Sequence, residues 1–227
     1  MRGAHRVRWA AGALAALLVS SPLPCAAIDW LVLVVDRSNS IDDRELALQR
    51  RAYVRLLSDA NVISALGDVQ VAIVEFDTRA EIVVDWTDPL NAARLYQRKP
   101  PDGLRGQTGI GGALGTALAL LVGKSGRLVI DISGDGKDNV DNTLLADMRA
   151  AADEQAVEVN GLAIITPDVP EIDRYYSQRV VNGFVLPVEE TGDFQSALKR
   201  KLFYEIAEAS PPSQARAAHF AGGPHWP

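Results

Sequence analysis

Three oxygen-bearing side chains, those of Asp36, Ser38 and Ser40, stand at alternate positions directly after an apolar run. Side chains at every second position can turn toward one point as an extended chain leaves a sheet. One carboxylate and two hydroxyls are hard oxygen ligands that suit Mg²⁺, which binds about six oxygens and keeps several waters. Such a set leaves the ion short of negative charge and able to take a carboxylate from a partner. The same residues could instead only cap the following helix, and the motif alone favours neither interpretation.

Two further candidate ligands stand far along the chain from this motif. Thr108 precedes a run of small and apolar residues, and Asp135 follows an apolar run within a Gly-Asp-Gly turn. Whether either joins the first three depends on the elements that carry them.

Hydrophobic patterning predicts strands that alternate with helices. Continuous apolar or β-branched runs predict strands over 30–35, 69–76, 81–84, 127–132, 157–164 and 184–186. Amphipathic or small-residue patterns predict helices over 42–58, 88–96, 108–121, 141–153, 172–181 and 194–206. Asp42 and Glu45 are spaced as a capping box, which marks the start of the first helix. The short connection at 77–79 predicts a hairpin whose second strand lies at an edge of the sheet.

This alternation predicts an α/β fold with a doubly wound, mostly parallel, Rossmann-like sheet and one antiparallel edge strand. In such sheets ligands bind beyond the carboxyl ends of the strands, where the strand order reverses. The loops after Val35 and Ile132 lie at that edge, together with the glycine-rich loop near Thr108. The fold therefore places the five candidate ligands near one another.

The ends of the chain have a different composition from its middle. Three arginines within the first eight residues precede an apolar run of about eleven residues and then small residues, which predicts a signal peptide over 1–27. The run is shorter than the roughly 18 residues that a membrane-spanning helix needs, and no other run is longer. We therefore expect an exported protein, periplasmic or extracellular, without an integral membrane segment. Residues 28–208 form the predicted domain, and 209–227 a disordered tail.

Charge and residue types exclude several classes of function. Cleavage after Ala27 removes three of the 23 basic residues and none of the 29 acidic ones, which changes the net charge from −6 to −9. An acidic surface argues against nucleic acid as a partner. Between Ile28 and Ala218 there is neither His nor Cys, which excludes histidine-assisted nucleophiles, thiol chemistry and the usual zinc sites there. We expect a protein that is not an enzyme.

The order of these motifs along the chain resembles a known family. Asp36, Ser38 and Ser40, then a loop threonine and an Asp-Gly pair after a central strand, are similar to the metal-ion-dependent adhesion site of the von Willebrand factor type A domain. The resemblance covers 29 to about 208. It implies a divalent cation, Mg²⁺ or else Mn²⁺ or Ca²⁺, bound by Ser38, Ser40 and Thr108, with Asp36 and Asp135 direct or through water. It also implies a protein partner that supplies a carboxylate to the ion.

A narrower resemblance rests on the sequence of the later strands and the last helix. The run at 129–136, the strand around Asn160 and the helix over 194–206 resemble an uncharacterised family of exported bacterial proteins within the same superfamily. No activity can be carried over from that family.

The motif departs from the family pattern at three positions, one of which is Asn39, where Gly is common. Gly134 stands where Ser or Thr is usual before the Asp, and Arg37 stands where a small or apolar residue is usual. Arg37 could steer an acidic ligand toward the ion or point into solvent, and we favour solvent.

Three further acidic residues lie near the predicted site. Asp131 interrupts an apolar strand, and it could orient the hydroxyl ligands or be a structural acid bonded to backbone amides, the option we favour. Glu75 and Asp77 end a strand near the same edge of the sheet, and we interpret them as turn and surface residues.

Two other functions remain open. A magnesium-dependent hydrolase would place Asp36 near the metal with Asp135 or Glu75 as base, although aspartyl-phosphate enzymes need a second acid where Ser38 stands. A metal-free interaction domain would keep the motif only as helix caps. The expected function is an exported interaction module that binds an acidic group of a protein partner through a divalent cation.

Overall fold

The computed structural model describes residues 27–99, 106–189 and 194–207. Six strands form one sheet in the order β3-β2-β1-β4-β5-β6, with every neighbouring pair parallel except β2 and β3. The strands are β1 (Ile28–Asp36), β2 (Gln70–Phe76), β3 (Ala80–Thr87), β4 (Arg127–Gly134), β5 (Glu158–Ile165) and β6 (Val185–Glu189). The doubly wound α/β sheet with an antiparallel edge strand is therefore confirmed.

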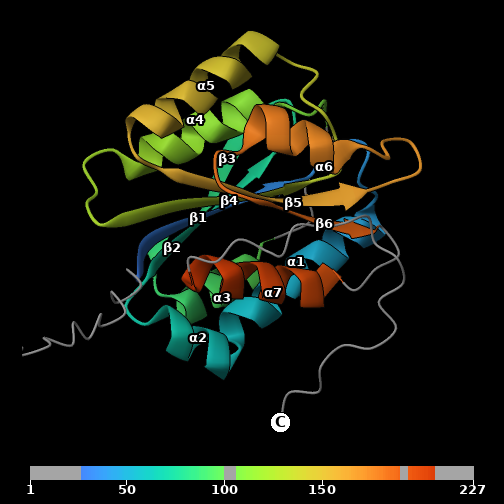
Figure 1. Ribbon diagram of the computed structural model, residues 1–227. Helices are drawn as coiled ribbons and strands as arrows, with labels where there is room; N and C mark the ends of the chain where they lie inside the picture. Colours follow the sequence, from blue (N-terminus) through green and yellow to red (C-terminus); the bar gives the residue numbers. More distant parts are fainter. Residues whose placement is uncertain (1–26, 100–105, 190–193, 208–227) are drawn as a thin grey trace, which may run out of the picture.

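Helices cover both faces of this sheet. The helices are α1 (Asp43–Ser58), α2 (Ala60–Leu66), α3 (Pro89–Gln97), α4 (Ile110–Leu121), α5 (Asn142–Glu154), α6 (Ile172–Tyr175) and α7 (Phe194–Ile206). In Figure 1, α4, α5 and α6 lie on one face, and α1, α2, α3 and α7 on the other. None of the helices in the described part of the chain is both long and apolar enough to span a bilayer.

The two core layers follow from the alternation of side chains along the central strand. On β1, Leu31 and Leu33 pack toward α1 and α7, while Val32 and Val34 pack toward α4. All four are fully buried because helices cover both faces of the sheet. Burial on both faces explains why β1 is a continuous apolar run in the sequence rather than an alternating one.

The start of α1 agrees with the sequence-based prediction, whereas α2 and the segment over 172–181 differ from it. Asp42 and Glu45 form the expected capping box of α1. Asp59, directly after the helix expected over 42–58, is the N-cap of α2, which was not expected and is too short to have a clear period. The helix expected over 172–181 is one α-helical turn followed by the π-helical segment Tyr176–Val180.

The predicted signal peptide, except Ala27, and the predicted tail over 209–227 lie outside the described residues. Both remain expectations.

Candidate metal centre

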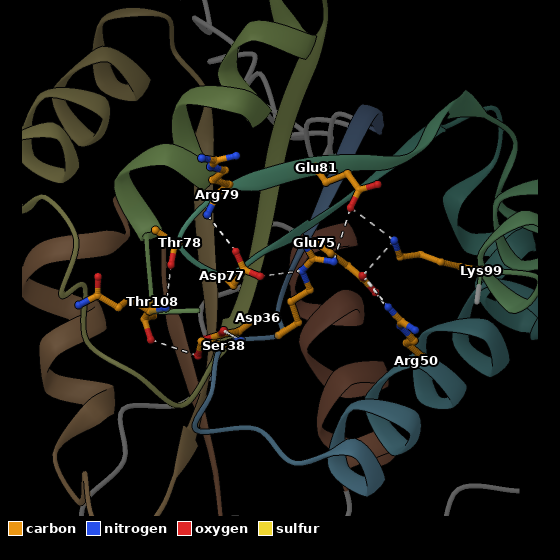
Figure 2. A network of polar contacts seen from close by, with 12 residues as sticks. Asp36, Ser38, Arg50, Glu75, Asp77, Thr78, Arg79, Glu81, Lys99 and Thr108 are labelled. Carbon is orange, nitrogen blue, oxygen red and sulfur yellow. Dashed lines mark hydrogen bonds and ion pairs between the residues drawn. The ribbon is translucent and has the colours of Figure 1, made fainter. Parts of the chain in front are cut away.

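The five predicted ligands lie together at the carboxyl ends of β1 and β4. After β1 the chain adds β2 and β3 on one side, and it then crosses to β4 on the other side of β1. The strand order therefore reverses between β1 and β4, which is where such sheets form ligand sites. The loop before α4 reaches the same place and brings Thr108 beside Ser38, as Figure 2 shows.

Hydrogen bonds join the five side chains into one cluster. Thr108 Oγ1 donates to Ser38 Oγ at 3.1 Å, and the two serine Oγ atoms lie 3.0 Å apart. Ser40 Oγ donates to Asp135 Oδ1 at 2.7 Å. The backbone N–H of Ser38 donates to Asp36 Oδ1 at 2.8 Å. Oxygens from three separated segments thus converge on one small volume.

Four of the five side chains are nearly sealed from solvent, with Asp36 at 0% and Asp135 at 6% exposure, while Ser40 is exposed. Burial and the nearby charge of Asp135 raise the pKa of Asp36 to about 7. Burial also raises the pKa of Asp135. The charge of Asp135 contributes to the shift of Asp36, whereas the shift of Asp135 comes from burial and, less strongly, from Glu45.

The donor set fits a hard divalent cation. Asp36 Oδ2 is buried and has no hydrogen-bond partner among the described residues, so one carboxylate oxygen is left for a ligand that the protein does not supply. Hydroxyl and carboxylate oxygens are the ligands that Mg²⁺ and Mn²⁺ take. No group of three or more His, Cys, Asp or Glu side chains with metal-binding spacing occurs in the described ranges. The cluster instead combines two carboxylates with three neutral hydroxyls.

Backbone contacts fix the loop that carries Thr108. The Thr108 N–H donates to Asn139 Oδ1 at 2.8 Å, and the Asn139 N–H donates to the Thr108 carbonyl at 3.0 Å. The Gly109 N–H donates to the Asp77 carbonyl at 2.9 Å. Asn139 is a positioning residue that the sequence did not reveal, since an exposed loop asparagine after a strand has many other uses.

Gly134 is explained by a tyrosine from the π-helical segment. A Cβ atom at Gly134 would lie 2.6 Å from both Asp36 Oδ2 and Tyr176 Oη. Tyr176 is fully buried, and its hydroxyl has no hydrogen-bond partner among the described residues. The Ser or Thr that is usual at this position cannot fit while Tyr176 occupies the space.

Arg37 does not point into solvent, so the favoured interpretation was wrong. Its side chain is 13% exposed and lies against the β2–β3 hairpin, with Nε 3.4 Å from Asp77 Oδ2 and Nη1 3.5 Å from Glu81 Oε2. Both acids belong to a segment more than 35 residues away, and local sequence gives no sign of them.

Glu75 and Asp77 are buried, so their interpretation as surface residues was wrong. Glu75 is fully buried and accepts from Arg50 Nε at 2.7 Å and Nη2 at 2.6 Å, and from Tyr96 Oη at 2.7 Å. Lys99 Nζ lies 3.6 Å away (Figure 2). Asp77 Oδ1 accepts from the Arg79 N–H at 3.0 Å. Glu75 is thus a charge-paired structural acid with no access to a substrate.

Asp131 pairs with the last helix. Lys201 Nζ of α7 lies 2.6 Å from Asp131 Oδ1 and 2.6 Å from Glu205 Oε1, and all three residues are buried. Asp131 precedes Asp135 by four residues, about 13 Å along an extended chain. Its partner is a lysine rather than the backbone amides we favoured, and none of its described contacts is with a hydroxyl of the candidate centre.

The fold and the site can now be set against known proteins. A family model with the description "Protein of unknown function (DUF1194)" matches residues 28–210, most of the chain. The chain belongs to this DUF1194 family. No curated protein matches the sequence.

Solved structures share the fold at low sequence identity. BatB from Bacteroides thetaiotaomicron has a TM-score of 0.61 and 18% identity, covering 80% of this chain and 100% of its own. The vWF domain of the type V pili tip protein Mfa5 from Porphyromonas gingivalis has a TM-score of 0.59 and 10% identity over 84% and 99%. The DUF1194 domain therefore has the von Willebrand factor type A fold.

A third similar structure holds a metal. Proximal thread matrix protein 1 from the mussel byssus, "with zinc occupied MIDAS motif", has a TM-score of 0.61 and 19% identity over 78% of this chain. The chain spans 45% of that protein, so the likeness extends only to the shared domain.

Proposed function

We propose that this protein is an exported interaction module that binds an acidic group of a protein partner through a divalent cation. The observation that carries the proposal is the convergence of five side-chain oxygens, with Asp36 Oδ2 buried and unpartnered beside them. The von Willebrand factor type A fold supports it, because one protein of that fold has a zinc-occupied MIDAS motif.

Each ligand candidate has a distinct part in this proposal. Ser38, Ser40 and Thr108 would offer neutral hydroxyl oxygens, and Asp36 and Asp135 would balance part of the charge. When bound, the cation supplies an attraction for an anionic oxygen that these side chains alone cannot provide. The hydroxyls keep the ion electron-poor, so a carboxylate from a partner is a favourable further ligand.

A hydrolase fits the geometry less well. Glu75, the more distant of the two candidate bases, is buried and paired with Arg50, and it is held by three hydrogen bonds. Asp135 is occupied by Ser40 and lies within the ligand cluster. Glu75 is therefore not available to take a proton from a water beside the site, and one oxygen of Asp135 already accepts from Ser40.

A metal-free interaction domain predicts a different role for Asp36. In that case Asp36 serves only to accept the hydrogen bond from the Ser38 N–H. The burial of its second oxygen without a partner then costs free energy for no gain.

Two proteins similar in fold are named as pilus proteins, Mfa5 and the PilB minor pilin from Streptococcus sanguinis, which favours an exported location for this chain too.

The test is calorimetric titration of Mg²⁺ and of Mn²⁺ into EDTA-treated protein, with Asp36→Ala alongside. Saturable binding that the substitution abolishes is the expected result. Equal heats in both proteins would place the ion elsewhere. No heat and no thermal stabilisation by either ion in the wild type would overturn the metal-dependent function and favour the metal-free domain.

A further inference from the structure

A groove opens beside the candidate metal centre and continues along α1. It has a volume of about 490 Å³, and Asp135 forms part of its lining. α1 provides one wall, and the end of β5 with the first turn of α7 provides the other. A ligand bound at the metal centre can therefore extend into this groove without crossing any other surface.

Gln49 gives the groove a polar anchor. It lines the groove from the buried face of α1 and is 5% exposed. Its Oε1 atom is buried and has no hydrogen-bond partner among the described residues. A buried acceptor without a partner costs about 1–3 kcal/mol, and an apolar residue at this position would avoid that cost. The unpartnered oxygen points to a ligand that brings an N–H group.

The remaining walls combine apolar side chains with charges of both signs, because Glu45 lines the groove near Asp135 and two arginines line it elsewhere. Ile41, Leu48 and Phe194 line the groove, and Leu48 is 50% exposed despite its size. Arg51 and Arg55 are exposed and line it farther along the helix. Positions 41 to 55 span about 20 Å at the helical rise, the length of about six residues of extended chain.

We propose that this groove binds an extended acidic segment of the partner protein. One acidic side chain of that segment reaches the metal centre, and a backbone N–H donates to Gln49 Oε1. An apolar side chain packs against Leu48 and Phe194, and a second acidic side chain pairs with Arg51 and Arg55. The proposal rests on the metal-dependent function and adds the class of partner, a peptide segment with two acidic residues and one apolar residue between them.

The experiment uses a phage-displayed library of random heptapeptides as the probe. Phage are selected on the immobilised full-length protein with excess Mn²⁺ and eluted first with EDTA and then with acid, and the peptides of both pools are synthesised for affinity measurement. We expect sequences in which two acidic residues flank an apolar one. Their affinity should fall about tenfold in Gln49→Leu, the cost of one lost hydrogen bond of about 1.4 kcal/mol.

Two further variants separate the groove from the general charge of the protein. Arg51→Glu should weaken the peptides at least as much as Gln49→Leu. Arg200→Glu, at an exposed position of α7 that does not line the groove, should leave them unchanged. Gln49→Leu should also raise the melting temperature without peptide, which shows that it folds and that the buried acceptor is unpaired.

The outcomes distinguish the groove from the metal. Peptides that need Mn²⁺ but bind all variants equally would overturn the groove and leave the metal-dependent function standing. Calorimetric Mn²⁺ binding without any EDTA-eluted peptide would overturn the groove as well. Peptides that ignore Mn²⁺ but lose affinity in Gln49→Leu would support the groove and count against the metal.

Discussion

Replacing Asp36 with Asn should stabilise the metal-free protein and remove its response to metal. The pKa of Asp36 in the folded protein is raised to about 7 from an ordinary value of 3.8, chiefly by burial and next by Asp135. The folded state therefore binds more protons than the unfolded state between these pH values, and stability falls as pH rises through that range. Above it, the full penalty of the ionised side chain applies.

The size of the effect follows from that difference in pKa. About three pKa units at 1.36 kcal/mol each correspond to about 4 kcal/mol, the largest gain that the substitution can give at pH 8 to 9. Asn retains the acceptor for the Ser38 N–H, and its Nδ2 replaces the oxygen near Tyr176 Oη. The gain should disappear toward pH 4, where the wild-type carboxyl is protonated.

Metal should narrow the difference in stability between the two proteins. At a free Mn²⁺ concentration of 100 times its Kd, the wild type gains about 2.7 kcal/mol, and Asp36→Asn should gain almost nothing. Urea unfolding followed by tryptophan fluorescence measures both effects, since Trp30 and Trp86 lie in the folded domain. Asp141→Asn is the control, because Asn caps a helix as well as Asp does and Asp141 is the N-cap of α5.

Two results would refute this reasoning. A metal-free Asp36→Asn protein that is less stable than wild type at pH 8 would show that the carboxylate is a structural hydrogen-bond acceptor with no electrostatic penalty. Equal stabilisation of both proteins by Mn²⁺ would show that the ion binds without Asp36.

Three other outcomes are expected. Gly134→Ser should abolish Mn²⁺ binding by calorimetry and lower the melting temperature, because its Cβ would lie 2.6 Å from Asp36 Oδ2 and Tyr176 Oη, while Gly134→Ser with Tyr176→Ala should recover part of the stability. Burial and then the charge of Asp131 raise the pKa of Glu205 to about 8, so wild-type stability should fall between pH 5 and 8, and Glu205→Gln should flatten that fall in urea titrations. Mass spectrometry of protein exported from a bacterial host should show a new N-terminus at Ile28, and an intact leader would contradict export by this route.

The sequence predicted the fold because its strands and caps are local features. Apolar β-branched runs mark the six strands, and the capping box at Asp42 marks the start of α1. The ligand cluster was also predictable, since parallel topology alone brings the end of β1 to the end of β4. The exact contact of Thr108 with Ser38 needed only the additional fact that the loop before α4 returns to the same edge.

What the sequence could not show are charges paired over long separations. Glu75 was interpreted as a turn and surface residue because it ends a strand near the edge of the sheet. Its partners Arg50 and Tyr96 come from helices on either side of its strand in the sequence. The buried ion pairs of Lys201 were not predicted either, because a lysine on an amphipathic helix is usually solvated. The burial of Gln49 could have been predicted, because it is a polar residue on a helix face otherwise made of Leu46, Ala52 and Tyr53.

In the proposed function, the groove would give the candidate metal centre a selectivity that the ion alone lacks. Carboxylates are present on almost every protein surface, and a cation attracts all of them, so an ion held by hydroxyls supplies affinity with little discrimination. A wrong partner without an N–H at that place leaves Gln49 Oε1 unpaired, as it is in the free protein, and gains no hydrogen bond there. It must also place its chain against Leu48 and beside Arg51, which repels a positively charged segment. Gln49→Leu should therefore lower the affinity for cognate peptides and leave that for scrambled peptides unchanged, which a comparison of the two on the same variant measures directly.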